Sequence, residues 1–422
     1  MVTLMERYLV SGGNRLVGTV RIAGATKNSG LKHMAAALLA RGRTRLSNMP
    51  PVSDLEVMIT LFERLGASVE WTGDEEITVD TTAPIHPVAP AELVTKMRAS
   101  INVLGPLLAR YGRAEVALPG GDNIGTRRID MHLRGLQDMG AEVEVRDGFV
   151  VATAEKLVGA RHVLDFPSVG ATENLLTAAT LAKGTTVIDN AAREPEITDL
   201  AAFLNRMGAH ILGAGSSTIE VEGVDELSST DAHIMGDRIE AGTFLMACGA
   251  AGGELLLEGT KVEHLEMVVL KLGDMGLRVS PAPTGIWVRA DERLRACDIA
   301  TLPFPGFATD FMPMAVALLC VADGPSIVTE NVYDNRLAFV DELARLGADI
   351  RAEGRHAVIR GVDRLHGGEV RAHDVRAGAA LVVAALAAEG ETVVSDVHHV
   401  ERGYPRLPER LAAVGGRVER LD

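Results

Sequence analysis

One loop of the sequence combines the residue types that general acid catalysis needs. It runs from Leu118 to Asp130 and reads Leu-Pro-Gly-Gly-Asp-Asn-Ile-Gly-Thr-Arg-Arg-Ile-Asp. Glycines flank Asp122 near its tip, and two arginines, Arg127 and Arg128, stand near its end. A carboxyl group on a glycine-bounded loop can swing over a cleft and deliver a proton. The plainer interpretation is a solvated turn; the composition favours a lid that carries a general acid.

Four cations stand at the starts of apolar helices, in a chain whose formal net charge is −15. They are Lys27, Arg98, Arg238 and Arg376. A helix N-terminus already carries partial positive charge, so a cation there is unfavourable by roughly several tenths of a kcal/mol. Each of the four could instead pair with a nearby carboxylate, and for any one of them this alternative is equally good. As a set they favour the binding of phosphates and carboxylates.

A unit that recurs six times along the chain must position these residues. Each copy contains a short phrase that ends in glycine, and the steps between these glycines are 74, 68, 68, 71 and 68 residues. Each glycine follows an amphipathic run and precedes an alternating apolar segment, which is typical of a helix that ends at a left-handed glycine before a strand. Recurrence in register indicates a repeat architecture. The glycines are Gly66, Gly140, Gly208, Gly276, Gly347 and Gly415.

The repeated unit reads as helix, strand, helix, strand, strand. Its first helix is apolar on most faces and is expected to be buried, whereas its second helix is amphipathic and is expected to lie between core and solvent. In the third copy the second helix is predicted from about Ile197, with Thr198 or Asp199 as its cap. The buried helices are predicted over residues 28–39, 98–109, 171–182, 238–250, 309–321 and 375–388.

The repeat count predicts two domains of three units each, because 422 residues exceed what one core usually holds. The polar segment 226–232, Glu-Leu-Ser-Ser-Thr-Asp-Ala, is the weakest joint and lies half-way along the repeats. We therefore expect one domain over 25–230 and a second from 231 to 422. A ligand site between the two lobes is the default expectation.

Composition excludes several classes of protein. A net charge of −15 argues against a non-specific nucleic-acid binder, and no apolar run is long enough to span a membrane. The N-terminus lacks the pattern of a signal peptide, and three irregularly spaced cysteines suit a reducing compartment, so a cytoplasmic protein is expected. The sequence has no metal-ligand spacing, no phosphate-binding P-loop and no Gly-x-Ser-x-Gly elbow. No metal or cofactor is therefore predicted.

Several longer motifs together resemble one family of enzymes. The chain is similar over nearly its whole length to the UDP-N-acetylglucosamine 1-carboxyvinyltransferases, enolpyruvyl transferases of the EPSP synthase superfamily. The resemblance implies two inside-out α/β domains of three repeats each, with the N-terminal segment 1–24 joining the domain 231–422. The motifs are the 118–130 loop, Lys27-Asn28-Ser29, Met97-Arg-Ala-Ser100, Ser168-Val-Gly-Ala-Thr172, Asn190-Ala-Ala-Arg-Glu-Pro-Glu196, Pro303-Phe-Pro-Gly-Phe-Ala-Thr-Asp310, Thr329-Glu-Asn-Val-Tyr-Asp-Asn-Arg336, Asp374-Val-Arg376 and Glu401-Arg-Gly-Tyr404.

The family transfers the enolpyruvyl group of phosphoenolpyruvate to the 3-hydroxyl of UDP-N-acetylglucosamine, by addition and then elimination, in the first committed step of peptidoglycan precursor synthesis. By position, the resemblance implies catalytic roles for Lys27, Asp122, Asp310 and Arg402, with Asp310 as the base at the sugar hydroxyl. It implies that Lys27, Asn28, Arg127, Arg336, Arg376 and Arg402 bind phosphoenolpyruvate. It implies that Arg98, Arg127, Arg128, Ile129, Asp130, Met131, Ser168, Val169, Gly170, Asp310 and Val332 bind the UDP-sugar.

Three positions depart from the family pattern. Asp122 stands where most members carry cysteine, the residue that fosfomycin alkylates, so resistance to fosfomycin is expected. Thr26 lengthens the usual Gly-Ala-Lys-Asn phrase by one residue, and Arg128 stands where proline is common. The alternatives are an enolpyruvyl transferase with another acceptor, either another uridine nucleotide or shikimate 3-phosphate, and a catalytically silent UDP-sugar-binding paralogue. Lys27, Asp122, Asp310 and Arg402 together argue against the silent paralogue.

Overall fold

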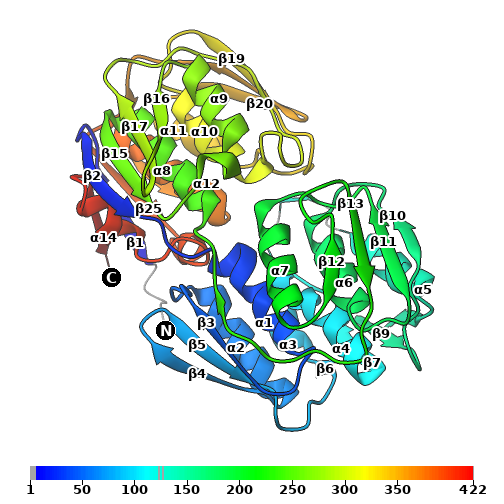
Figure 1. The fold of residues 1–422 in the computed structure, drawn as a ribbon. Helices are drawn as coiled ribbons and strands as arrows, with labels where there is room; N and C mark the ends of the chain where they lie inside the picture. The colour runs from blue at the N-terminus through cyan, green and yellow to red at the C-terminus, as the bar shows by residue number, and fades with distance from the viewer. Residues whose placement is uncertain (1–5, 122–123, 126–127, 422) are drawn as a thin grey trace. The chain divides into compact units, whose positions relative to one another are not determined.

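The chain folds as two units, each with its own core. A computed structural model describes residues 6–121, 124–125 and 128–421. Unit 1 holds the described residues up to Ala23 and from Gly236 onward, together with Ile124 and Gly125. Unit 2 holds the remaining described residues between Gly24 and Met235. Figure 1 colours the chain by residue number, so that unit 2 runs from blue to green, and the blue strands β1 and β2 lie among the later strands of unit 1.

Among the described residues, six four-stranded sheets, three in each unit, form the framework and share one topology. In each sheet the first two strands are parallel and the other neighbours are antiparallel. Unit 2 contains β14(Ala232–His233)-β3(Arg43–Ser47)-β5(Glu76–Asp80)-β4(Ser68–Gly73), β6(Val88–Ala89)-β7(Arg113–Ala117)-β9(Phe149–Thr153)-β8(Glu142–Arg146) and β10(Arg161–Val163)-β11(Thr185–Asp189)-β13(Thr218–Glu222)-β12(His210–Leu212).

Unit 1 repeats this arrangement with strands from both ends of the chain. Strand β1 lies between β25 and β26, and β2 pairs with β15, so the N-terminal segment belongs to this unit as expected. The sheets are β2(Leu16–Arg21)-β15(Gly253–Glu258)-β17(Gly285–Ala290)-β16(Arg278–Ala282), β18(Ile299–Ala300)-β19(Pro325–Thr329)-β21(His356–Arg360)-β20(Asp349–Glu353) and β23(Glu369–Arg371)-β25(Glu391–Ser395)-β1(Arg7–Ser11)-β26(Arg417–Leu421), with a small pair β22(Leu365–His366)-β24(Ala388–Glu389).

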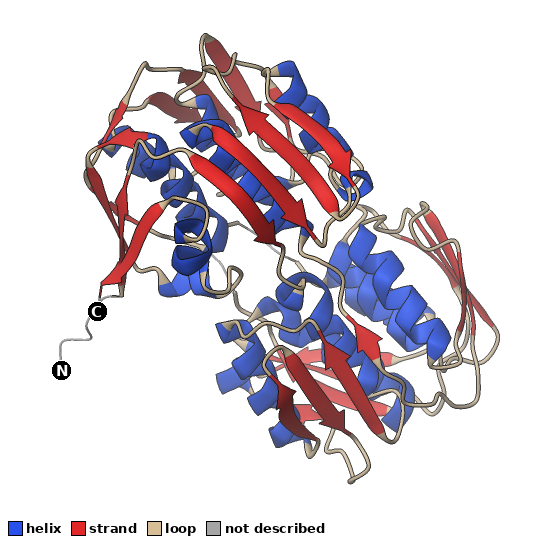
Figure 2. Ribbon diagram, turned by 60° about the vertical axis from the view of Figure 1, so that its left-hand side comes forward, coloured by secondary structure: helices blue, strands red, loops and turns tan. Residues whose placement is uncertain are grey.

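The helices follow the predicted pattern of one buried and one surface helix in each repeat. The buried helices are α1(Leu31–Ala37), α4(Leu104–Tyr111), α6(Val169–Ala179), α8(Arg238–Ala251), α10(Met312–Leu319) and α12(Val375–Ala387). The half-buried helices are α2(Ser53–Leu65), α5(Asp130–Asp138), α7(Pro195–Arg206), α9(Glu266–Asp274), α11(Val340–Arg345) and α14(Leu407–Ala412). Short turns of helix are η1(Thr26–Gly30), α3(Ala91–Val94), η2(Arg98–Val103), η3(Val262–His264), η4(Thr309–Phe311) and α13(His398–Glu401). In Figure 2 the sheets of each unit lie outside these helices.

All six phrase-ending glycines adopt the left-handed conformation that the sequence predicts. Their φ angles lie between 87° and 108°, a region that side chains with a Cβ atom rarely enter. The α/β repeat architecture is therefore confirmed, and it rests on a stereochemical requirement at the end of each surface helix.

Two local expectations differ from the structure. Helix α7 begins at Pro195, two residues before the predicted start, because proline suits the first helical position. Neither Thr198 nor Asp199 caps this helix. The expected boundary at 230/231 falls inside a segment that remains with unit 2, since β14 pairs with β3 and the N–H of Ile234 bonds the carbonyl of Ser47.

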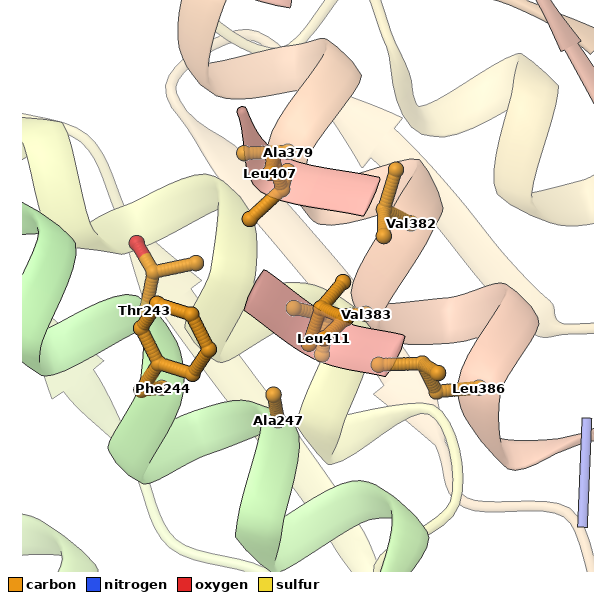
Figure 3. Close-up of a pocket in the computed structure, with 9 residues that line it drawn as sticks. All are labelled: Thr243, Phe244, Ala247, Ala379, Val382, Val383, Leu386, Leu407 and Leu411. Atoms are coloured by element: carbon orange, nitrogen blue, oxygen red, sulfur yellow. The ribbon is translucent and has the colours of Figure 1, made fainter. Parts of the chain in front are cut away.

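The core of unit 1 contains a small apolar cavity between α8, α12 and α14 (Figure 3). Its volume of about 10 Å³ has room for roughly one water molecule. Eight of the nine lining residues are apolar, among them Phe244, Val383 and Leu411, and the ninth is Thr243, so the cavity is a packing feature and not an anion site. In the part of the chain that the structure describes, every helix is too short or too polar to cross a membrane.

Candidate active site

The turn that carries Lys27 and Asn28 has an unusual backbone. Residues Thr26–Gly30 form a π-helical turn in which the N–H of Leu31 reaches the carbonyl of Thr26. Turns of this kind occur often at functional sites. The buried hydroxyl of Thr26 donates to the carbonyl of Pro50 at 3.0 Å, so the additional residue of the Gly-Ala-Thr-Lys-Asn phrase is packed inside unit 2.

Lys27 forms an ion pair with Asp54 of α2. The Lys27 side chain is 20% exposed and that of Asp54 is 3% exposed. A carboxylate that is almost fully buried needs a cation nearby, and here that cation is the one expected to bind phosphoenolpyruvate. The pair holds the ammonium group in a fixed direction.

The remaining residues predicted for unit 2 cluster around the start of α5 and α6. Arg98 donates from Nη2 to the carbonyl of Arg128 at 3.2 Å, which joins two segments predicted to bind the UDP-sugar. The Arg128 side chain is exposed. Ser168 caps α6 by accepting the N–H of Ala171 at 3.4 Å, and the half-buried Val169 and Gly170 form the first turn of that helix. Ile129 and Met131 flank Asp130, whose pKa is lowered by hydrogen bonding from Arg134.

A buried histidine of α5, His132, supports the start of α6 inside unit 2. Gly105 donates its N–H to Asn174 Oδ1 at 2.8 Å, which fixes the amide of Asn174 so that its Nδ2 donates to His132 Nδ1, also at 2.8 Å. A Cβ atom on Gly170 would lie 3.3 Å from the ring of His132. Burial lowers the pKa of His132 to about 3, so the ring is neutral near pH 7.

His132 predicts a loss of stability in mild acid. Burial holds the folded-state pKa of His132 below its ordinary value of 6.5, so the stability that the neutral ring contributes is complete above pH 6.5 and declines as pH falls toward 3. The slope is at most ~1.4 kcal/mol per pH unit. Denaturant unfolding at pH 7 and pH 5 should show this decline, and His132→Asn should reduce it. The same change at His210, whose side chain is 66% exposed, serves as a control; equal profiles for wild type and His132→Asn would contradict the prediction.

In unit 1 a carboxylate and two buried guanidinium groups meet. Asp310 Oδ1 accepts from Arg336 Nη2 at 3.2 Å, and its Oδ2 accepts from Arg376 Nε at 3.0 Å. The side chains of Arg336 and Arg376 are 2% and 3% exposed, whereas that of Asp310 is 33% exposed. The carboxylate therefore faces solvent on one side while the two cations hold the other, so the structure joins three of the predicted residues.

Arg376 has a second set of partners in the same unit. Its guanidinium lies 5.3 Å from the centre of the Tyr404 ring, whose hydroxyl is 2.9 Å from the hydroxyl of Thr243. Burial lowers the pKa of Arg376, but Tyr404, Asp310 and Asp237 raise it by more, so the guanidinium stays charged. A fixed, charged and almost buried guanidinium is suited to binding a carboxylate or phosphate.

The backbone near Val332 is held by a buried carboxylate. Glu330 Oε1 accepts the N–H groups of Val332 and Tyr333 at 2.7 and 3.0 Å, and Oε2 accepts the hydroxyl of Thr309 at 2.8 Å. Glu330 is 1% exposed, so these bonds satisfy it inside the protein. It thereby connects the residue before Asp310 to the segment predicted to contact the UDP-sugar.

Two of the four helices that begin with a cation, α8 at Arg238 and α12 near Arg376, already have a protein carboxylate at the N-terminus. Their backbone N–H groups therefore do not form the anion sites that the sequence favours. Asp237 accepts the N–H groups of Ile239 and Glu240 at the start of α8. Asp374 accepts those of Arg376 and Ala377 at the start of α12. Protein carboxylates thus already bind these backbone donors.

Two predicted residues, Asp122 and Arg127, lie outside the described residues. Between them, the carbonyl of Ile124 accepts the N–H of Asn335 at 3.2 Å. Arg402 follows the short helix α13 and is half-buried, and its N–H bonds the carbonyl of His399 at 3.4 Å. No group of three or more metal-ligating side chains occurs among the residues that the structure describes.

The sequence analysis missed several residues that support the site. Three of them, Asp54, Lys32 and Glu173, are charged side chains inside apolar helices or at a helix start, and this mismatch is the signal that could have identified them. The other two, Glu330 after β19 and Tyr404 after α13, lie outside helices and strands and carry no such signal.

Known proteins include relatives of this chain that match nearly its whole length. A family model described as EPSP synthase (3-phosphoshikimate 1-carboxyvinyltransferase) matches residues 10–411. A protein of Corynebacterium jeikeium (strain K411) named UDP-N-acetylglucosamine 1-carboxyvinyltransferase is 50% identical over 419 residues, which cover 99% of this chain and 100% of that protein. A protein of the same name from Nocardia farcinica (strain IFM 10152) is 51% identical over 423 residues, covering 99% of each.

Solved structures show the same fold. The enolpyruvyl transferase NikO from Streptomyces tendae superposes with a TM-score of 0.88 at 28% identity, covering 99% of each chain. EPSP synthase from Acinetobacter baumannii superposes with a TM-score of 0.76 at 20% identity, covering 99% of this chain and 100% of that one, and this likeness concerns the fold alone.

Proposed function

The chain belongs to the EPSP synthase (3-phosphoshikimate 1-carboxyvinyltransferase) family, and from this premise we propose that it transfers the enolpyruvyl group of phosphoenolpyruvate to the 3-hydroxyl of UDP-N-acetylglucosamine and releases phosphate. The observation that carries the choice of acceptor is the identity of about one half, over nearly the full length, with proteins named for that reaction. The same observation favours this acceptor over shikimate 3-phosphate and over another uridine nucleotide.

The described clusters are suited to the two halves of this reaction. Addition requires a base at the sugar hydroxyl and a proton for the methylene carbon of phosphoenolpyruvate; elimination then removes a proton and releases phosphate. We assign the base to Asp310, which is held by Arg336 and Arg376 and partly faces solvent. Lys27, fixed by Asp54, is the cation for the phosphate, and Asp122 is the general acid.

The remaining assignments follow the predicted positions. Asn28, Arg127, Arg336, Arg376 and Arg402 complete the binding of phosphoenolpyruvate. Arg98, Arg128, Ser168, Val169, Gly170 and Val332 bind the UDP-sugar, with Arg127 and Ile129–Met131. The proposal places the reaction in the cytoplasm, at the start of peptidoglycan precursor formation.

One assay tests the proposed function. Purified protein is given phosphoenolpyruvate and UDP-N-acetylglucosamine, released phosphate is measured, and the nucleotide product is analysed by mass. We expect phosphate together with an enolpyruvyl adduct on the UDP-sugar. Absence of both from a folded protein, or an adduct formed only in a parallel reaction with shikimate 3-phosphate as the acceptor, would overturn the proposal.

The residue at position 122 predicts how the enzyme responds to fosfomycin. The wild type should remain active because alkylation needs a thiolate, and burial raises the pKa of Cys297 and raises those of Cys248 and Cys320 to about 12. Asp122→Cys should become sensitive, with a covalent adduct on the new thiol, as judged by activity and intact mass. Wild-type inactivation with an adduct on Asp122 would contradict the prediction.

A further inference from the structure

Lys32 lies in α1, a helix whose other residues apart from His33 are apolar, and its side chain turns back toward the π-helical turn. Lys32 Nζ donates to the carbonyl of Asn28 at 2.8 Å and to that of Lys27 at 3.2 Å. The side chain is only 12% exposed. The ammonium group of Lys32 therefore binds the backbone of the two residues assigned to phosphoenolpyruvate.

A buried carboxylate holds Lys32 from the other side. Glu173 of α6 lies 3.6 Å from Lys32 Nζ, and its side chain is 3% exposed. Glu173 Oε2 accepts from Asn102 of η2 at 2.6 Å. The π-helical turn η1, helix α1 and helix α6 of unit 2 thus meet at the ammonium group of Lys32. The short helix η2 joins them through the contact of Asn102 with Glu173.

Stability alone is a poor explanation for this ion pair. Removing two charges from water costs several kcal/mol for each ion, and apolar side chains of similar volume are often equally stable or more stable. Such a pair is better explained where it fixes a geometry, because an ammonium group with three donors orients the acceptors around it. The acceptors here are the carbonyls of Lys27 and Asn28.

Other side chains anchor the same turn at different points. Thr26 donates to Pro50, and Ser29 Oγ donates to Asp199 Oδ2 of α7 at 2.7 Å. These bonds hold the ends of the turn, whereas Lys32 holds its middle.

We propose that Lys32, oriented by Glu173 and Asn102, is a positioning residue that sets the direction of Lys27 and Asn28 toward phosphoenolpyruvate. The inference deepens the proposed function and depends on it. A displacement of about 1 Å in a positioned group can reduce the rate by about 10²-fold. The effect of losing Lys32 should therefore appear with phosphoenolpyruvate and be small with the UDP-sugar.

The main test removes both charges together, so that no unpaired buried ion remains. Lys32→Met/Glu173→Gln should fold with a melting temperature near that of the wild type, while its KM for phosphoenolpyruvate rises about tenfold or more. Its KM for UDP-N-acetylglucosamine should change less than about twofold. The control is Lys271→Met, because Lys271 also donates to a backbone carbonyl, that of Asp298 at 2.9 Å, but in unit 1 on α9. This control should leave all three values unchanged.

A second variant keeps the test decisive if the double variant does not fold. Lys32→Arg retains the charge beside Glu173, but a planar guanidinium cannot reproduce the contacts of an ammonium group. It should raise the KM for phosphoenolpyruvate by several fold with little change in melting temperature.

A folded variant of either kind with wild-type kinetics, or one with equal losses for both substrates, would overturn the inference. If the wild type itself releases no phosphate, the proposed function fails, and calorimetric binding of phosphoenolpyruvate to wild type and Lys32→Arg then decides the inference without turnover.

Discussion

Replacing Asp310 with asparagine is expected to lower kcat by about 10²–10⁴-fold, because an amide of the same size cannot take the proton of the sugar hydroxyl. The geometry makes the effect specific. Arg336 and Arg376 already bind one side of the carboxylate at 3.2 and 3.0 Å, so the substitution alters charge without opening space. Steady-state phosphate release measures the change, and substrate binding should persist.

Stability must be measured alongside activity for this variant. Both guanidinium groups are nearly buried, and loss of a charged partner from such a group costs a few kcal/mol. Asp363→Asn is the matched control, since Asp363 pairs with Arg293 and is 88% exposed. We expect a cost below about 1 kcal/mol and full activity for that control. An Asp310→Asn enzyme that is folded and turns over at the wild-type rate would remove Asp310 as the base.

The repeat architecture could be predicted from the sequence because it depends on local stereochemistry. The glycine that ends each surface helix must adopt a positive φ, and the neighbouring strand alternates in polarity, so both leave a pattern in a few consecutive residues. The short edge strands that form the parallel pair in most of these sheets could not be predicted in this way. Strands such as β6, β14 and β18 have two residues each, which is too short for any periodicity.

The candidate site shows the same division between local and distant information. The sequence identifies Lys27 and Arg376 because a cation at the start of an apolar helix is locally conspicuous. Their carboxylate partners are not local: Asp54 lies 27 residues from Lys27, and Asp310 lies 66 residues from Arg376. The sequence offers two alternatives for each cation, an anion site or one half of an ion pair. Both alternatives apply to Lys27 and Arg376, because each has a carboxylate partner and is still suited to a substrate anion.

Replacing Lys27 with methionine is expected to lower kcat/KM for phosphoenolpyruvate by about 10³-fold or more, because the phosphate loses a fixed cation in a partly buried position. The KM for the UDP-sugar should change little, since Lys27 is not among its proposed contacts. Initial rates of phosphate release over a range of each substrate separate the two effects.

The ion pair with Asp54 supplies the control that distinguishes chemistry from folding. Lys27→Met leaves a carboxylate that is 3% exposed without its lysine, so the single variant should also lose stability. Lys27→Met/Asp54→Asn removes that charge and should recover much of the melting temperature while activity stays low. If activity returned together with stability, Lys27 would be a structural cation, and the phosphate would have to be held by Arg127 and Arg402 instead.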